Sequence, residues 1–166
     1  MKTLHAISDG GDFTIGVALA RFNAEIAGML FDGCRDALLD AGVRDDRIVL
    51  AGVPGAWELP LACRSLIETG RFDAVIALGA VIRGETAHFD FISSECARGL
   101  QQLALETDVP VAFGVLTPDN GEQARRRADP ERGNKGREAA LAALEMAALQ
   151  RAVAGLALEG GNGDEG

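Results

Sequence analysis

The sequence has no tyrosine, only two histidines and only three cysteines among its 166 residues. Cys34, Cys63 and Cys96 are far apart and form no Cys-x-x-Cys pair, which argues against a disulfide framework and against a zinc site. Each lies in a helix-like segment of small and apolar residues, so we expect buried free thiols, as a reducing cytoplasm favours. His5 is the only other histidine besides His88, so we expect no metal site.

Positive charge is also scarce, with 16 Lys and Arg against 25 Asp and Glu and a net charge of −9. Nucleic acid is therefore not expected as a partner, because a phosphate backbone requires a basic face, although a local pocket can still bind a small anion. We find no apolar stretch of about 20 residues that would span a membrane and no signal peptide. We expect a soluble, cytoplasmic protein without a membrane partner.

Apolar runs alternate with helical patterns four times along the chain, which predicts an α/β fold with a parallel sheet and helices on both faces. We assign residues 1–157 to a single domain with a flexible arm at 1–12, and 158–166 to a disordered, acidic, Gly-rich tail. The strands are predicted at 13–20, 47–53, 73–78 and 109–116, and the helices at 24–41, 57–69, 89–106, 120–128 and 135–156. Asn23 is expected to cap the first helix, Gly42 to end it, and Asp119 or Asn120 to cap the fourth.

Ligands of such folds bind at the carboxyl ends of the strands. The unusual residues of this sequence lie at those ends, in the segments 21–23, 54–58, 79–88 and 116–118. We therefore expect the functional site at this edge of the sheet.

His88 follows a loop that leaves a buried strand, and its side chain can both give and take a proton. The alternative is a histidine that only caps or packs the helix start. Gly84, Glu85 and Thr86 precede it, where glycine admits an anion close to the backbone and Thr86 lies near a helix N-terminus. The spacing is not that of a P-loop, and a simple turn and cap remains the alternative.

Six cations cluster in this acidic chain: Arg125, Arg126, Arg127, Arg132, Lys135 and Arg137. A lysine in the first turn of a helix is unfavourable against the helix dipole, so Lys135 indicates an anion receptor. We expect Arg125, Arg126 and Arg132 to be ordinary solvated charges.

Aromatic residues lie at two turns between a strand and a helix. Phe22 and Trp57 are placed where a ring can stack on a planar ligand, whereas Phe113 lies inside the fourth strand, where we expect core packing. Glu58 opens a helix, which by itself explains an acidic residue there.

Together these residues resemble the lumazine synthase family over about residues 13–149. The shared motifs are Arg21-Phe22-Asn23, residues 53–60, residues 79–89, residues 113–117, Glu122-Gln123-Ala124 with Arg127-Ala128, and Gly133-Asn134-Lys135-Gly136. Asn120-Gly121 and the bulky Trp57 depart mildly from the family's pattern. Several motifs in the correct order are far more specific than any one of them.

The resemblance implies a three-layer, flavodoxin-like, doubly wound fold and a transferase without a cofactor. That enzyme condenses 5-amino-6-(D-ribitylamino)uracil with 3,4-dihydroxy-2-butanone 4-phosphate, releases phosphate and water, and gives 6,7-dimethyl-8-ribityllumazine, in the penultimate step of riboflavin biosynthesis.

The resemblance also implies a role for each site residue. Phe22 stacks on the pyrimidine, Ala56, Trp57 and Glu58 hold the ribityl chain, and Ala80, Val81 and Ile82 contact the pyrimidine. Gly84, Glu85, Thr86 and Arg127 bind the phosphate side, and His88 transfers protons. Phe113, Arg127 and Lys135 come from a neighbouring subunit.

Homo-oligomers built of pentamers are implied in the same way, and the resemblance leaves open a pentamer, a decamer or a 60-subunit shell. Riboflavin synthase is a candidate partner. Two alternatives remain. One is a non-catalytic paralogue that binds flavin or lumazine, and the other is a flavodoxin-like electron carrier, which the first strand disfavours because no Ser/Thr-rich phosphate loop follows it.

Overall fold

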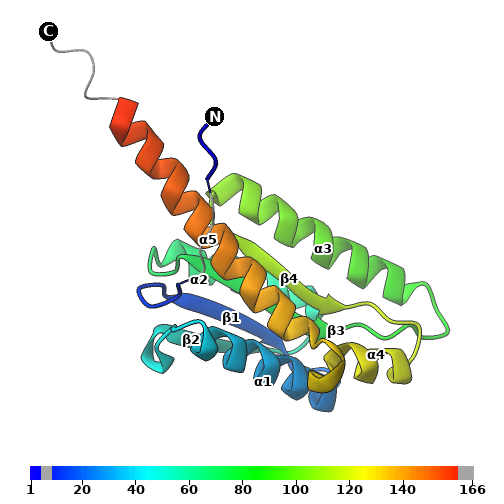
Figure 1. Cartoon of the computed structure of the whole chain (residues 1–166). Coiled ribbons are helices and arrows are strands. Elements are labelled where there is room, and N and C mark those ends of the chain that lie inside the picture. The colour runs from blue at the N-terminus through cyan, green and yellow to red at the C-terminus, as the bar shows by residue number, and fades with distance from the viewer. Residues whose placement is uncertain (5–8, 161–166) are drawn as a thin grey trace, which may run out of the picture.

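The computed structural model describes residues 1–4 and 9–160, with side chains up to Leu158 in the last helix. The elements follow one another as β1 (Ile15–Ala20), α1 (Ala24–Asp40), η1 (Asp45–Arg47), β2 (Ile48–Val53), η2 (Ala56–Glu58), α2 (Leu59–Glu68), β3 (Ala74–Ala80), α3 (His88–Thr107), β4 (Val111–Leu116), α4 (Gly121–Ala128), η3 (Pro130–Arg132) and α5 (Lys135–Gly160). The η elements are single 3₁₀ turns of three residues. The strands and α-helices are labelled in Figure 1. The predicted alternation of strands and helices is confirmed.

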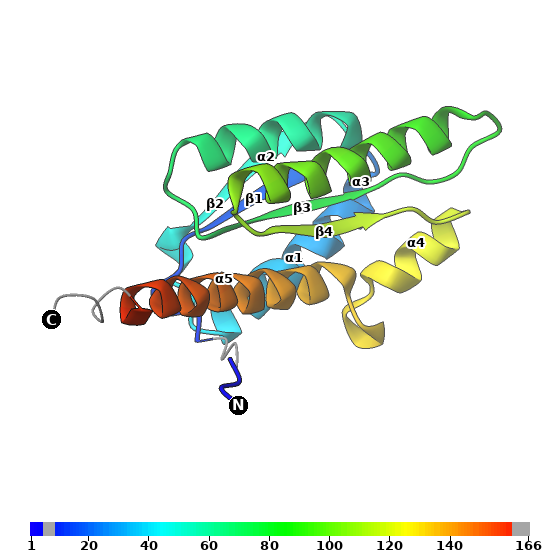
Figure 2. The same ribbon diagram turned by 90° about the horizontal axis from the view of Figure 1, so that it is seen from above.

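The four strands form one parallel sheet in the order β2-β1-β3-β4. Helices α2 and α3 cover one face of the sheet, and α1 and α5 cover the other (Figure 2). This is the predicted three-layer, doubly wound α/β fold. Because all strands run the same way, their carboxyl ends meet at one edge, where α4 also lies.

Alternate residues of the two central strands feed two separate cores. Ile15 and Ile76 pack among the residues of α1 and α5, while Ala18 and Ala77 pack among those of α2 and α3. Strands buried on both faces must be apolar throughout, which is why β1 and β3 could be recognised as continuous apolar runs.

Two of the predicted helix caps are confirmed and one is wrong. Gly42 adopts a φ of 93° after α1, a left-handed conformation that suits glycine, and the Asn120 side chain accepts a hydrogen bond of 2.9 Å from the Gln123 N–H at the start of α4. Asn23 occupies the cap position of α1 but makes no side-chain cap bond. Its amide instead donates to the carbonyl oxygen of Ala80 at 3.0 Å, because the carboxyl end of β3 lies beside it.

Element ends differ from the prediction by a few residues. Strand β3 continues to Ala80, and the helix expected from Trp57 begins as the 3₁₀ turn η2. Helix α5 extends to Gly160, so the predicted tail begins inside a helix, and its remaining residues, 161–166, lie outside the described residues.

The predicted N-terminal arm lies partly outside the described residues, at positions 5–8. Its end is fixed to the body of the protein: the N–H of Gly10 donates to the carbonyl of Ala41 at 2.8 Å, and Arg47 donates to the carbonyl of Asp12 at 2.6 Å.

One described helix, over Lys135–Leu158, is long and apolar enough to cross a membrane by length and composition, with a mean hydropathy of 1.4. The expectation that no stretch reaches this length is therefore wrong. Ala140, Ala143 and Leu144 of this helix are buried in the core shared with α1 and the sheet. Only 17% of the helix's most apolar 18-residue window is buried among the described residues.

The three cysteines are free and buried, as predicted. Burial raises the pKa of the Cys34 and Cys63 thiols to about 12 and that of Cys96 to about 11, with a further contribution to Cys63 from Cys96. All three thiols are therefore protonated at neutral pH, the form in which a thiol is a weak nucleophile.

Candidate functional site

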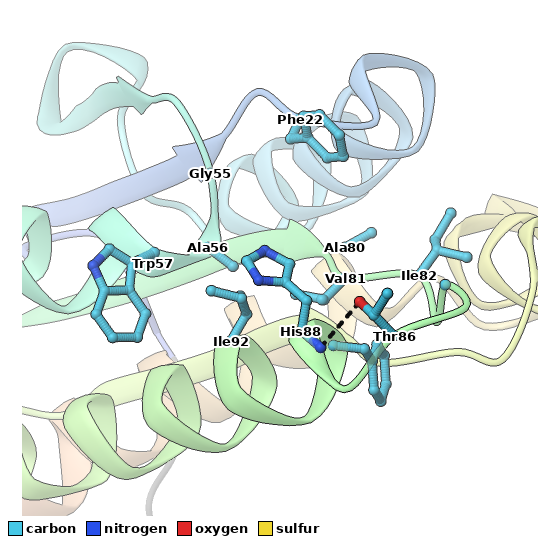
Figure 3. A pocket seen from close by; sticks show the side chains of 12 residues that line it. Phe22, Gly55, Ala56, Trp57, Ala80, Val81, Ile82, Thr86, His88 and Ile92 are labelled. Atoms are coloured by element: carbon cyan, nitrogen blue, oxygen red, sulfur yellow. Dashed lines mark hydrogen bonds between the residues drawn. The ribbon is translucent and has the colours of Figure 1, made fainter.

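A pocket of about 310 Å³ opens at the carboxyl ends of the strands, where the sequence places it. Its lining combines the ends of β1, β2 and β3 with the first turns of α3 (Figure 3). The lining residues are Phe22, Gly55, Ala56, Trp57, Ala80, Val81, Ile82, Gly84, Thr86, His88, Phe89 and Ile92. Nine of the predicted site residues are thus brought together in one cavity.

Phe22 is held at a rigid corner after β1. Its backbone N–H donates to the carbonyl of Pro54 at 3.1 Å, and the following residue, Asn23, has a left-handed φ of 59° and is bonded to Ala80. These bonds connect the ends of three strands, so the ring, which is 71% exposed, is presented to the pocket without core contacts of its own. An exposed ring in this setting can stack on a planar ligand.

Trp57 lines the pocket and is also largely exposed, whereas Glu58 does not line it. The Glu58 carboxylate accepts a hydrogen bond of 2.9 Å from the Gly55 N–H and thereby closes the turn η2. Within one chain Glu58 fixes the shape of the pocket wall that Ala56 and Trp57 provide.

Backbone bonds to the neighbouring strand hold the end of β3. The Val81 N–H donates to the carbonyl of Leu116 at 2.8 Å, and the Arg83 N–H donates to that of Pro118 at 3.0 Å. Ala80, Val81 and Ile82 therefore form a fixed floor of small and branched side chains.

His88 is the first residue of α3. Its N–H approaches the Thr86 hydroxyl at 3.4 Å, and its exposed imidazole projects toward Ala56, with Phe22 and Trp57 on either side in the view of Figure 3. Thr86 and Gly84 line the pocket beside it, while Glu85 is exposed and does not. An imidazole thus faces a largely apolar cavity.

Three lining residues, Gly55, Phe89 and Ile92, were given no individual role by the sequence analysis. Ile92 lies four residues after His88 and therefore on the same face of α3, a spacing that could have revealed it. Arg83 was also unassigned. Its guanidinium lies 4.2 Å from the centre of the Phe89 ring and bridges Asp90 and Asp119, at 3.3 Å each. It ties the pocket wall to the loop before α4.

Phe113, Arg127 and Lys135 do not line the pocket. Phe113 is 40% exposed and lies in a second groove, between α3 and α5 along the outer side of β4. The expectation of core packing is wrong for this residue, because β4 is an edge strand with no neighbour to cover it.

Most of the cation cluster is neutralised by nearby carboxylates. Arg125 pairs with Glu25, Arg126 with Glu122, Arg132 with Asp129, Lys135 with Glu138 and Arg137 with Asp40. The solvated role expected for Arg125, Arg126 and Arg132 is confirmed. Arg127 differs, since its exposed guanidinium has no hydrogen-bond or ion-pair partner among the residues that the structure describes.

The pocket itself contains no cation: none of its described lining residues is lysine or arginine. Within the described part of the chain, an apolar pocket with one histidine is therefore separate from an arginine on α4 that has no partner there.

The fold and pocket define a doubly wound α/β protein with a small-molecule site at the carboxyl ends of its strands. A family model described as 6,7-dimethyl-8-ribityllumazine synthase matches residues 12–151. The chain belongs to this family.

Curated relatives carry the same name. The protein from Edwardsiella ictaluri (strain 93-146) is 51% identical over 154 residues, which cover 92% of this chain and 99% of the relative. Proteins from Yersinia pestis (strain Pestoides F) and Yersinia pseudotuberculosis serotype O:1b (strain IP 31758) are each 53% identical over 156 residues, covering 93% of this chain and 100% of the relative.

Proposed function

We propose that the protein is a transferase of riboflavin biosynthesis that condenses 5-amino-6-(D-ribitylamino)uracil with 3,4-dihydroxy-2-butanone 4-phosphate to give 6,7-dimethyl-8-ribityllumazine, phosphate and water. The observation that carries this proposal is the convergence of Phe22, Trp57, residues 80–82 and His88 on one pocket. Membership of the lumazine synthase family supports it.

The pocket receives the pyrimidine substrate. Phe22 stacks on the ring, and Ala80, Val81 and Ile82 lie against its other groups at the strand end. Ala56, Trp57 and Glu58 border the ribityl chain, whose hydroxyls find acceptors on the Glu58 carboxylate that the Gly55 N–H leaves available. The small side chains at the floor leave room for a planar ring.

His88 transfers the protons of the reaction. The substrate amine attacks the ketone carbon of the butanone phosphate, and loss of water forms an imine. Phosphate then leaves, and the ribityl-bearing nitrogen closes the ring with loss of a second water. Each step moves a proton between nitrogen, oxygen and carbon, which an imidazole at the pocket centre can accept and return. The amine is itself the nucleophile, consistent with three neutral thiols.

The leaving phosphate requires a fixed positive charge, and the pocket of one chain lacks one. The Arg127 guanidinium, which has no partner among the described residues, has the fork geometry that suits phosphate. We assign Arg127 to the phosphate, together with Gly84, Glu85 and Thr86, and we assign Lys135 and Phe113 to the rim of the pyrimidine site.

Arg127, Lys135 and Phe113 are brought to the pocket by a neighbouring copy of the chain. The exposed groove beside β4 that holds Phe113 gives the surface for this contact. A closed ring of such head-to-tail contacts is consistent with the pentamer implied by the family, either alone or within a decamer or a 60-subunit shell. The protein acts in the cytoplasm, and riboflavin synthase, which consumes the product, is the partner enzyme.

Incubation of the purified protein with both substrates tests the proposal. Formation of 6,7-dimethyl-8-ribityllumazine, followed by its absorbance and fluorescence, is expected together with a solution mass of at least five chains. A protein that binds lumazine or flavin tightly but makes none identifies the non-catalytic paralogue and rejects the synthase.

A further inference from the structure

Asn134 is the one described residue with a polar or charged side chain that is buried, at 1% exposure. Its amide NH₂ donates to the carbonyl of Ala128 at 2.6 Å and to that of Met29 at 2.8 Å. Its amide oxygen accepts from the Arg137 N–H at 3.0 Å. One side chain therefore joins the end of α4, the middle of α1 and the first turn of α5, and every polar atom it buries has a partner.

Two glycines make the space for this amide. A Cβ atom at Gly33 of α1 would overlap the Asn134 side chain, and one at Gly136 of α5 would overlap the carbonyl oxygen of Leu30. We call Gly33, Asn134 and Gly136 the Asn134 junction. Close approach of α1 and α5 at this junction leaves room for no side chain other than the amide.

The junction lies directly beside the cations of the proposed receptor. Ala128, whose carbonyl Asn134 holds, follows Arg127, and Lys135 follows Asn134. Arg127 has no partner of its own among the described residues, so within these residues only the backbone held at Ala128 fixes the position from which its side chain extends. A fixed backbone is what a preorganised phosphate receptor needs.

We infer that Asn134 is a positioning residue, which acts through the Ala128 carbonyl to aim Arg127 at the phosphate, and that Gly33 is required for this although it lies far away in the sequence. The inference rests on the proposed function, because it takes Arg127 as the phosphate ligand. It deepens that function by naming the residues that hold the receptor in place.

Gly33→Ala is the direct test, because it displaces the Asn134 amide and leaves Asn134, Arg127 and Lys135 unchanged. Gly28→Ala is the matched control, since Gly28 lies on the same helix and a Cβ there meets nothing within 4 Å. Steady-state kinetics should give KM for each substrate, and inhibition by inorganic phosphate should give a constant that reports on the receptor alone.

For Gly33→Ala we expect both the KM of the butanone phosphate and the inhibition constant of inorganic phosphate to rise at least about tenfold. The KM of the pyrimidine should change by less than about threefold. Gly28→Ala should leave all three constants at the wild-type values. Equal phosphate constants in the two variants, or equal shifts for both substrates, overturn the inference.

Asn134→Ser covers the case in which Gly33→Ala does not fold. The hydroxyl keeps a donor and an acceptor but is too short to reach both carbonyls, so the same selective loss of phosphate affinity is expected. Unchanged phosphate affinity in this variant overturns the inference.

The wild type separates this inference from the proposed function. A wild type that binds inorganic phosphate, measured by calorimetry, but forms no lumazine rejects the proposed function and leaves the junction to be judged by phosphate affinity. A wild type that forms lumazine while both variants bind phosphate normally rejects the junction alone. A wild type that does neither rejects both.

Discussion

The pocket at the ends of β1, β2 and β3 and the region where α4 meets α5 are built on opposite principles. The pocket is apolar, contains no cation, and presents exposed rings and one imidazole on backbone corners. The α4–α5 region has charged side chains at its surface, and the buried amide of Asn134 connects the segments beneath them. A planar ring needs the first kind of surface and a phosphate the second. The proposed substrate site is thus divided between two regions, and the described residues of one chain do not bring them together in one pocket.

Removal of the free cation gives the largest expected effect. Arg127→Ala should lower kcat/KM for the butanone phosphate by about 10²–10³-fold, because a preorganised donor to the leaving phosphate is lost. Arg126→Ala is the matched control, since that guanidinium is paired with Glu122 at the surface. Steady-state kinetics gives kcat/KM for both variants, and equal losses would contradict the assignment of the phosphate contact to Arg127.

Removal of the imidazole acts on the other region. His88→Ala should lower kcat by about 10²-fold, as expected for the loss of a general acid–base group, while both KM values stay near those of the wild type. His5→Ala serves as the histidine control. A large rise in KM with unchanged kcat would show that His88 binds rather than transfers protons.

Thiol labelling reports on the packing beneath each region separately. Cys34 lies beside Gly33 in the core under α5, whereas Cys63 and Cys96 lie in the core under the pocket. Gly33→Ala should speed the labelling of Cys34 about tenfold relative to Cys63 and Cys96, because it loosens only the first core. Mass spectrometry after a timed pulse of iodoacetamide measures this, and equal acceleration at all three thiols would contradict it.

The raised pKa values of the same three thiols also predict the direction in which the free energy of unfolding changes with pH. Their pKa values in the folded protein, about 11 to 12, lie above the ordinary thiol value of 9.0 because the three thiols are buried. The folded state therefore keeps protons that the unfolded state releases, and the free energy of unfolding should fall as the pH rises from about 9 toward 12. Urea denaturation across this range checks the direction.

Mixing two inactive variants tests the division of the site directly. If each site takes His88 from one chain and Arg127 from its neighbour, random co-assembly of His88→Ala with Arg127→Ala restores about a quarter of the sites to wild-type composition. Activity near that fraction is expected after unfolding and refolding the two together. The separately refolded variants are the control, and no recovery above their sum would place both residues in one chain.

The smallest effect is expected from Gly28→Ala. Replacing a glycine in the middle of a helix by alanine should raise the free energy of unfolding by about 0.5–1 kcal/mol, since the added methyl meets nothing. Chemical denaturation measures it. A loss of stability would show that this face of α1 is covered in the assembled protein.

Local signals in the sequence were sufficient for most of the fold. Several features depend only on residues that are close in sequence and could therefore be predicted. They are the apolar runs of β1 and β3, the glycine at position 42 and the Asn120 cap. The strand order could not, and Phe113 shows the consequence: its strand looks buried in sequence but lies at the sheet edge. The cap prediction for Asn23 was wrong for a similar reason, because its side-chain amide donates to a carbonyl of β3, which is distant in sequence.

The site was predictable where a residue type carries its own chemistry, as in Phe22, Trp57 and His88. It was not predictable where the role of a residue depends on its contacts with segments that are distant in sequence. Arg83 and Asn134 look in sequence like one more charge and one more loop residue, and only their contacts with distant segments give them a role.

The Asn134 junction also limits how this chain can change. Because a side chain at position 33 would occupy the volume of the amide at position 134, neither position can be altered freely while the other stays as it is. A larger residue at 33 demands a smaller one at 134, and a smaller residue at 134 leaves two backbone carbonyls in need of water or another donor. Redesign of the phosphate side therefore has to treat α1 and the α4–α5 connection as a single unit, exchanged together rather than residue by residue.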